Sequence, residues 1–136
     1  MSSGLRFAVV PGTYAVARLA PTEPVPDWGM LGTWWSVTRT RAELSVVCAQ
    51  VHVPTGVRAE RGFALLQLAG PFPFTATGVL AAVVGPLAAA GIPVFTLSTF
   101  DTDYLLVAEA ECARALFVLQ AAGHVLETSS GGCSAS

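Results

Sequence analysis

The chain has 136 residues and a mass of 14.0 kDa, which fits one domain or two very small ones and excludes a multi-domain enzyme. Hydrophobic residues make up 53% of it and charged residues 12%, so it can build a core and is too poor in charge for intrinsic disorder. A formal net charge of -2 gives no basic field for phosphate backbones, so we expect no nucleic-acid partner.

The cysteines and histidines predict neither a metal site nor a cofactor. Cys48, Cys112 and Cys133 form no CxxC pair, and His52 and His124 stand far from them in sequence. An odd cysteine count without a signal-like start predicts a reducing, cytoplasmic location. The first two cysteines are expected as small core residues and the third as an incidental residue of the tail.

One apolar stretch, residues 79–97, raises the question of a membrane span. Gly85, Pro86, Gly91 and Pro93 interrupt it, and alanine supplies much of the rest. A spanning helix needs about 20 continuous, strongly apolar residues. We therefore expect no membrane partner.

The N-terminal half predicts short strands and one helical turn. Runs at 5–10 and 14–19 flank Pro11 and Gly12 and predict a hairpin. Thr40 and Glu43 have the spacing of a capping box, which predicts one turn of helix. Further strands are expected at 34–38 and 45–50, with a proline-rich loop at 20–32.

The C-terminal half predicts alternating strands and helices. Strands are expected at 63–68, 93–98, 104–107 and 124–126, and helices at 78–90 and 109–122. In the first helix Thr77 is the expected cap, Pro86 should bend the axis, and Leu80, Val83, Val84 and Leu87 form the expected core stripe. The order βαββαβ over about 63–126 predicts an α+β, ferredoxin-like unit with both helices on one face of an antiparallel sheet.

The predicted domain organisation follows from these elements. Residues 1–61 form a mostly strand N-terminal half, either a degenerate second copy of the unit or an extension of a shared sheet, with the copy favoured. Residues 62–127 form the complete unit. The Ser/Gly-rich tail, residues 128–136, is expected to be disordered.

Several side chains in these segments have more than one interpretation. Trp34 and Trp35 should point to opposite faces, so one is expected in the core and the other under a partner subunit or the proline-rich loop. Arg39 either clamps a carboxylate or, as favoured, pairs with Glu43. His52 and His124 are expected at the surface or at strand ends.

Three segments carry a resemblance to a known family. Residues 78–80 and 86–92 resemble the helix and following strand of ACT domains, which in other proteins bind free amino acids and regulate metabolism. Together with residues 35–40, 85–88 and 98–107, they are similar to ACT-type proteins related to the CASTOR arginine sensors. The resemblance covers about residues 5–126 and implies one half of such a cytoplasmic sensor, completed as a homodimer.

The resemblance implies a ligand pocket between ACT units or subunits. Its residues would come from the loop before the first helix, the helix itself and the segment before the second hairpin strand. Where the arginine sensor has an acidic side chain and a serine, this chain has alanines at 76 and 82. The implied set is Pro73, Phe74, Thr75, Ala76, Ala82, Val83, Thr99, Phe100 and Asp103.

An amino-acid site is also favoured by the residues themselves. Backbone N–H groups near Gly78, at a helix N-terminus, suit a carboxylate. Asp101 or Asp103 can accept an ammonium or a cationic side chain, although the same residues also suit a plain hairpin turn.

No catalytic residues are predicted. All seven basic residues are arginine, which excludes lysine Schiff-base chemistry, and no nucleophile, base and orienting group can be assembled. The favoured function is a non-catalytic regulatory protein that binds a small amino acid or related metabolite. The alternative is a structural or interaction protein whose pocket has degenerated.

Overall fold

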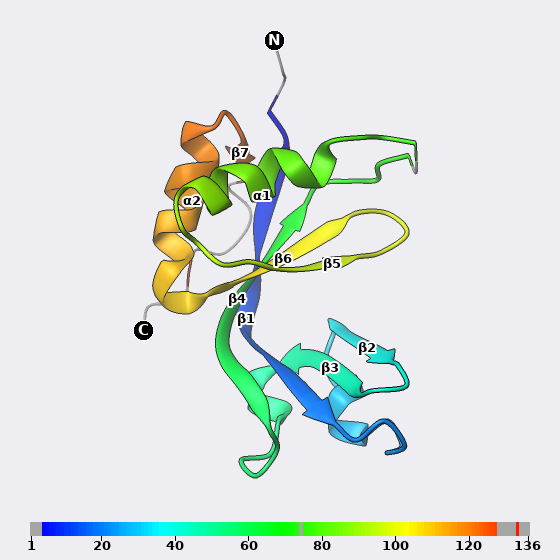
Figure 1. The fold of residues 1–136 in the computed structure, drawn as a ribbon. Coiled ribbons are helices and arrows are strands. Elements are labelled where there is room, and N and C mark those ends of the chain that lie inside the picture. Colours follow the sequence, from blue (N-terminus) through cyan, green and yellow to red (C-terminus); the bar gives the residue numbers. More distant parts are fainter. Residues whose placement is uncertain (1–3, 74, 128–132, 134–136) are drawn as a thin grey trace. The chain divides into compact units, whose positions relative to one another are not determined.

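The computed structural model describes residues 4–73, 75–127 and 133. The chain divides into two compact units (Figure 1). Unit 1 comprises residues 1–11 and 64–136, and unit 2 comprises residues 12–63. Two long strands, β1 (Arg6–Leu19) and β4 (Ala59–Leu68), contribute residues to both units.

Unit 1 contains the predicted α+β elements in the predicted order. After β4 come α1 (Val79–Ala89), β5 (Phe95–Ser98), β6 (Asp103–Ala108), the 3-10 turn η3 (Glu109–Glu111), α2 (Cys112–Ala121) and β7 (Val125–Leu126). The second predicted helix therefore begins with a 3-10 turn, and the other boundaries agree to within a few residues. The ferredoxin-like arrangement is confirmed.

Both helices of unit 1 cover the same face of its sheet. Val83 and Leu87 of α1 and Leu119 of α2 are fully buried, in one cluster with alternate residues of three strands. Alternation places residues i and i+2 of a strand on one face, so the cluster marks a single helix-covered face. The strand residues are Phe7 and Val9 of β1, Ala64, Leu66 and Leu68 of β4, and Leu105 and Val107 of β6.

The sheet of unit 1 differs from a self-contained βαββαβ unit in its strand order, β7-β1-β4-β6-β5. The start of β1 lies between β7 and β4, and Arg6 and Phe7 pair in parallel with Val125 and Leu126. The sequence placed residues 5–10 in the N-terminal half, whereas they group with unit 1. Periodicity identifies a strand but does not identify its partners.

The proline inside α1 is compensated by a histidine from the other end of unit 1. Pro86 has no N–H to donate to the carbonyl of Ala82, four residues earlier. Instead, Nε2 of His124 lies 2.7 Å from that carbonyl oxygen, and its Nδ1 accepts a hydrogen bond of 3.0 Å from the N–H of Leu5. His124 is 8% exposed, so it is a buried bridging residue beside β7 rather than a surface one.

Unit 2 consists of strands and 3-10 turns, without an α-helix in residues 12–63. Its sheet has the order β2-β3-β1-β4, where β2 is Trp35–Arg39 and β3 is Leu44–Ala49. The 3-10 turns are η1 (Asp27–Met30) and η2 (Gln50–His52). A separate core on one face of this sheet contains Ala15, Ala17, Leu44, Val46, Cys48 and Val53.

The predicted hairpin around Pro11 and Gly12 is wrong. Residues 6–19 form one continuous strand because its two ends have different partners: Arg6 and Phe7 pair with β7, and residues 14–19 pair with β3. Pro11 and Gly12 lie between these paired segments, and Gly12 takes a φ of 108° that other residues rarely adopt.

The capping box at Thr40 also forms no helix. The Thr40 hydroxyl accepts hydrogen bonds from the N–H groups of Ala42 and Glu43, as in a cap, but β3 begins at Leu44 and ends the turn. The predicted pair of Arg39 and Glu43 is absent as well. Arg39 donates to the backbone oxygens of Pro21 and Glu23, so it fixes the proline-rich loop.

The two tryptophans of unit 2 have different surroundings. The ring of Trp34 contacts Tyr14 edge to face, with centroids 5.7 Å apart, and Trp35 is 43% exposed. The remaining histidine, His52, is half-buried at the end of η2.

The cysteines form a disulfide that the sequence did not predict. Cys112, at the start of α2, is bonded to Cys133, while Cys48 is a buried free thiol, as expected. Cys112 is also a core residue, but Cys133 is not incidental, because it packs on the unit 1 core. The other tail residues, 128–132 and 134–136, lie outside the described residues, and so does their predicted disorder.

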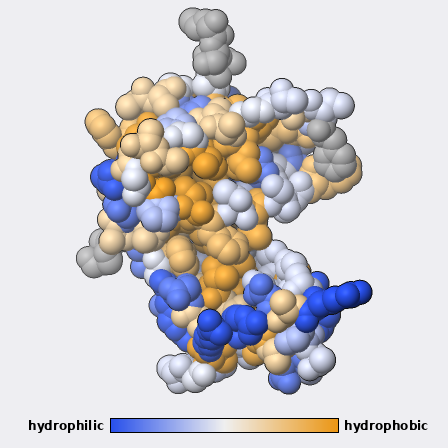
Figure 2. All heavy atoms as spheres, in the orientation of Figure 1, coloured by the Kyte–Doolittle hydropathy of each residue, from blue (hydrophilic) through white to orange (hydrophobic). Residues whose placement is uncertain are grey.

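None of the helices formed by the described residues is both long and apolar enough to cross a bilayer. The apolar run at 79–97 is divided between α1 and β5. Figure 2 shows the exposed side chains of one face coloured by hydropathy.

Candidate functional site

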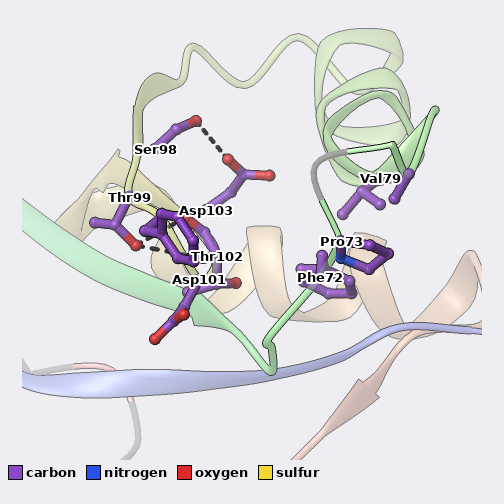
Figure 3. Close-up of a pocket in the computed structure, with 10 residues that line it drawn as sticks. Phe72, Pro73, Val79, Ser98, Thr99, Asp101, Thr102 and Asp103 are labelled. Carbon is purple, nitrogen blue, oxygen red and sulfur yellow. Dashed lines mark hydrogen bonds between the residues drawn. The ribbon is translucent and has the colours of Figure 1, made fainter.

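A pocket of about 240 Å³ opens on unit 1 where three segments meet. These are the loop after β4, the first residue of α1 and the turn between β5 and β6 (Figure 3). The lining residues are Phe72, Pro73, Ala76, Val79, Ser98, Thr99, Phe100, Asp101, Thr102 and Asp103.

The turn between β5 and β6 is fixed by its two threonines. The Thr99 N–H donates to the Thr102 carbonyl at 2.8 Å, and the Thr102 N–H donates to the Thr99 hydroxyl at 3.3 Å. The buried Thr102 hydroxyl donates to the carbonyl of Leu68, at the end of β4, at 2.8 Å. These bonds hold the turn against β4, so the side chains on it are preorganised.

A glycine allows the loop after β4 to approach this turn. A Cβ added at Gly70 would lie 2.7 Å from the Asp101 carbonyl oxygen, closer than side-chain atoms are found. Two residues later the Phe72 N–H donates to that same oxygen at 2.8 Å. The apolar wall formed by Phe72 and the acidic turn are therefore joined by a backbone hydrogen bond.

The pocket is acidic. Asp101 and Asp103 line it, and no arginine or histidine is among its described lining residues. The Ser98 hydroxyl donates to Oδ1 of Asp103, whose side chain extends from the turn toward α1, whereas Asp101 points away from that helix (Figure 3). Unit 1 carries two arginines and five acidic residues, a formal charge of -3, so the surrounding field has the same sign.

The opposite wall contains the N-terminus of α1. Gly78 occupies the cap position with a left-handed φ of 76°, and no side chain caps the helix. The cap predicted at Thr77 is therefore wrong. The first intrahelical bond joins the Ala82 N–H to the Gly78 carbonyl, so the N–H groups of the first turn have no partner within the helix. Val79, which lines the pocket, is in that turn.

The structure brings together six of the residues singled out in the sequence: Pro73, Ala76, Thr99, Phe100, Asp101 and Asp103. Thr75, Gly78, Ala82 and Val83 are not among the lining residues, and Phe74 lies outside the described residues. Val83 is fully buried in the core, and the backbone oxygen of Ala82 is bound by His124.

The pocket also contains residues that sequence reasoning missed: Phe72, Val79, Ser98 and Thr102. One of them, Ser98, could have been found from the hairpin predicted around Asp101. Ser98 and Asp103 are paired across β5 and β6, so their side chains lie on the same face of the sheet. Nothing in the sequence indicated that the loop before α1 would fold back onto the turn.

Within the residues that the structure describes, no group of three His, Cys, Asp or Glu side chains is arranged to hold a metal ion. The lining residues include two carboxylates and three hydroxyls without a histidine, cysteine or lysine. Such a set can accept hydrogen bonds from a cationic group and donate them to a polar one.

Two family models match the sequence. One, described as an ACT domain, matches residues 58–121, and another, described as an N-terminal domain, matches residues 12–56. No protein of curated function matches at a significant level.

Several solved structures share this fold, and a protein of similar sequence is among them. Protein Atu0741 from Agobacterium tumefaciens is 37% identical, with a TM-score of 0.88, and the alignment covers 93% of this chain and 94% of that one. A Vibrio cholerae protein of unknown function, described as a possible transport protein, is 20% identical over 89% and 91%, with a TM-score of 0.73. The regulatory subunit of aspartate kinase from Thermus flavus is 11% identical over 89% and 99%, with a TM-score of 0.63. The last two likenesses show the fold alone.

Proposed function

Because this chain belongs to the same family as Atu0741 of Agobacterium tumefaciens and carries an ACT domain over residues 58–121, we propose that it is a non-catalytic regulatory protein. Its ligand is a small amino acid or related metabolite with a cationic group. The observation that carries the proposal is the acidic pocket of unit 1, in which Asp103 is fixed by Ser98.

The size of the pocket supports a small ligand. A volume of about 240 Å³ accommodates about eight water-sized groups, if each occupies roughly 30 Å³. This is the size of a free amino acid and is too small for a nucleotide. Phe72 and Val79 offer apolar contact to the body of the ligand.

The charges support a definite orientation. The ammonium or cationic side chain lies against Asp103, since charge-assisted hydrogen bonds are the stronger kind. The carboxylate lies toward the first turn of α1, where N–H groups without intrahelical partners and the helix dipole favour an anion. A ligand with an acidic side chain is disfavoured, because Asp101 and Asp103 would repel it.

The oligomeric state of the protein is part of the proposal. We propose a homodimer in which a second subunit or ACT unit covers the pocket, as expected from the resemblance to CASTOR-like proteins. Phe100, which lines the pocket and is 78% exposed, provides an apolar contact for such a cover. Ornithine, lysine and arginine belong to the proposed ligand class, and the longer ligands would extend from the pocket toward its cover. The disulfide between Cys112 and Cys133 argues against the reducing, cytoplasmic location expected from the cysteine count.

A thermal-shift screen of the full chain against the twenty amino acids and ornithine at millimolar concentration tests the proposal. A ligand that binds only the folded state raises the melting temperature. We expect a rise with one or a few cationic amino acids, abolished by Asp103→Asn and retained in Asp27→Asn, an exposed aspartate in η1 that serves as the control. A flat response to all of them would favour the alternative, an interaction protein with a degenerated pocket.

A further inference from the structure

A second hollow, of about 190 Å³, lies entirely within unit 2 and carries charged groups of both signs. Five of the seven arginines are in this unit, with four acidic residues, which gives it a formal charge of +1. The charged residues that line the hollow are Arg18, Glu43, Arg58 and Glu60.

The hollow is formed by the sheet face opposite the unit 2 core. Arg18 of β1 is paired with Ser45 of β3. Leu44 and Val46, which flank Ser45 along β3, are fully buried in the core. Because side chains alternate along a strand, Arg18 and Ser45 project from the other face. The Arg18 N–H donates to the Arg58 carbonyl at 2.9 Å, which places Arg58 beside Arg18 in the same row.

Two arginines thus meet on neighbouring strands, an arrangement that is destabilising when nothing compensates it. Arg18 is partly compensated, since it donates to the Ala42 carbonyl at 2.8 Å and lies 4.0 Å from a carboxylate oxygen of Glu43. Among the described residues, the Arg58 guanidinium has neither an ion pair nor a hydrogen bond. Its donors are available to a ligand that enters the hollow.

The composition of the walls restricts the charge of that ligand. An anion alone would contact Arg58 and Arg18 but would also face the carboxylates of Glu43 and Glu60. A cation alone would face the two guanidiniums. A molecule with one negative and one positive group can satisfy both sides, and 190 Å³ accommodates about six water-sized groups.

We propose that this hollow is a binding site for a small zwitterion, separate from the pocket of unit 1. The carboxylate of the zwitterion pairs with Arg58, whose planar fork suits a bidentate contact, and the Ser45 hydroxyl lies in the same row. Its ammonium pairs with Glu60. This proposal does not depend on the function proposed for unit 1.

The test is a titration of the full, isotope-labelled chain with glycine, the smallest zwitterionic amino acid, followed by amide NMR shifts. We expect saturable shifts at residues 18, 45, 58 and 60. Arg58→Gln should weaken this binding about tenfold or more, as the loss of one charge-assisted contact implies. Arg41→Gln, at an exposed arginine outside the hollow, should change it less than twofold.

Further arms of the titration make the outcome decisive. Acetate and methylammonium, each with one charge, should bind more weakly than glycine, and Glu60→Gln should weaken glycine binding in a chain that keeps both arginines. Asp103→Asn should leave the shifts in unit 2 unchanged, which separates this site from that of unit 1. Acetate binding as tight as that of glycine, the absence of saturable shifts, or equal losses in Arg58→Gln and Arg41→Gln would each overturn the proposal.

Discussion

His124 and Pro86 are coupled through the carbonyl group of Ala82. Proline at position 86 removes the N–H that would bind this carbonyl within α1, and His124 supplies a donor at 2.7 Å. Replacement of His124 by phenylalanine keeps a ring of similar size and removes both ring nitrogens. It leaves the Ala82 carbonyl and the Leu5 N–H, which binds Nδ1 at 3.0 Å, without their partner.

The expected loss follows from these two groups. A buried polar group deprived of its partner costs about 1–3 kcal/mol. Both hydrogen bonds of His124 are part-buried, which puts each near the lower end of this range, so His124→Phe should lower the unfolding free energy by about 2 kcal/mol. In a Pro86→Ala chain, the new N–H of residue 86 can bind the Ala82 carbonyl, and only the Leu5 N–H loses its partner. The same His124 substitution should then cost about half as much, a coupling of about 1 kcal/mol.

Urea unfolding of the wild type, the two single variants and the double variant measures this coupling, provided that the slopes agree. His52→Phe is the matched control, since this half-buried histidine in unit 2 bridges no such groups, and its effect should stay within about 0.5 kcal/mol. If the single effects add to within about 0.5 kcal/mol, the explanation through the Ala82 carbonyl is refuted.

Three further predictions concern the cysteines and the one bidentate ion pair described. The disulfide spans 21 residues, so Cys133→Ser should lower the unfolding free energy by about 3 kcal/mol; three reactive thiols in the unreduced, unfolded chain would contradict the bond. Burial raises the pKa of the Cys48 thiol, so iodoacetamide should label it much more slowly in the folded than in the unfolded chain, and equal rates would oppose this. Hydrogen bonds from Arg114, at 3.1 and 3.2 Å, lower the pKa of Glu111 below its usual 4.5. The ionised Glu111 carboxylate therefore stabilises the folded state above pH 4.5. This stabilisation is lost as the pH falls through the lowered pKa that Glu111 has in the folded state. Arg114→Gln should raise the Glu111 midpoint in an NMR titration, and an unchanged midpoint would count against the pair.

Much of unit 1 was predictable from its sequence. The helices at 79–89 and 112–121 and the strands of the βαββαβ order are close to their predicted bounds. The reason is local: apolar residues recur with the period of a helix or a strand, and Gly91 ends the first helix, as expected. The stripe of Val83 and Leu87 is buried for the same reason.

The candidate site was predictable in part. Asp101 and Asp103 stand out as carboxylates in a turn between two strands, and both line the pocket. Phe72 and Thr102 could not be identified, since they reach the pocket through contacts across the chain. The Thr102 hydroxyl binds the carbonyl of Leu68, 34 residues away.

The partners of each strand and side chain depend on the tertiary structure. Both helices and most strands followed from the sequence, because helix and strand preferences depend on neighbours a few residues apart. The sequence did not determine that β1 continues through Pro11 to pair with both β7 and β3, or that Cys112 bonds to Cys133. Nor did it assign His124 to the carbonyl that Pro86 leaves unpaired. These contacts join residues between 21 and 119 positions apart. They stabilise the protein only once the whole fold has brought these residues together.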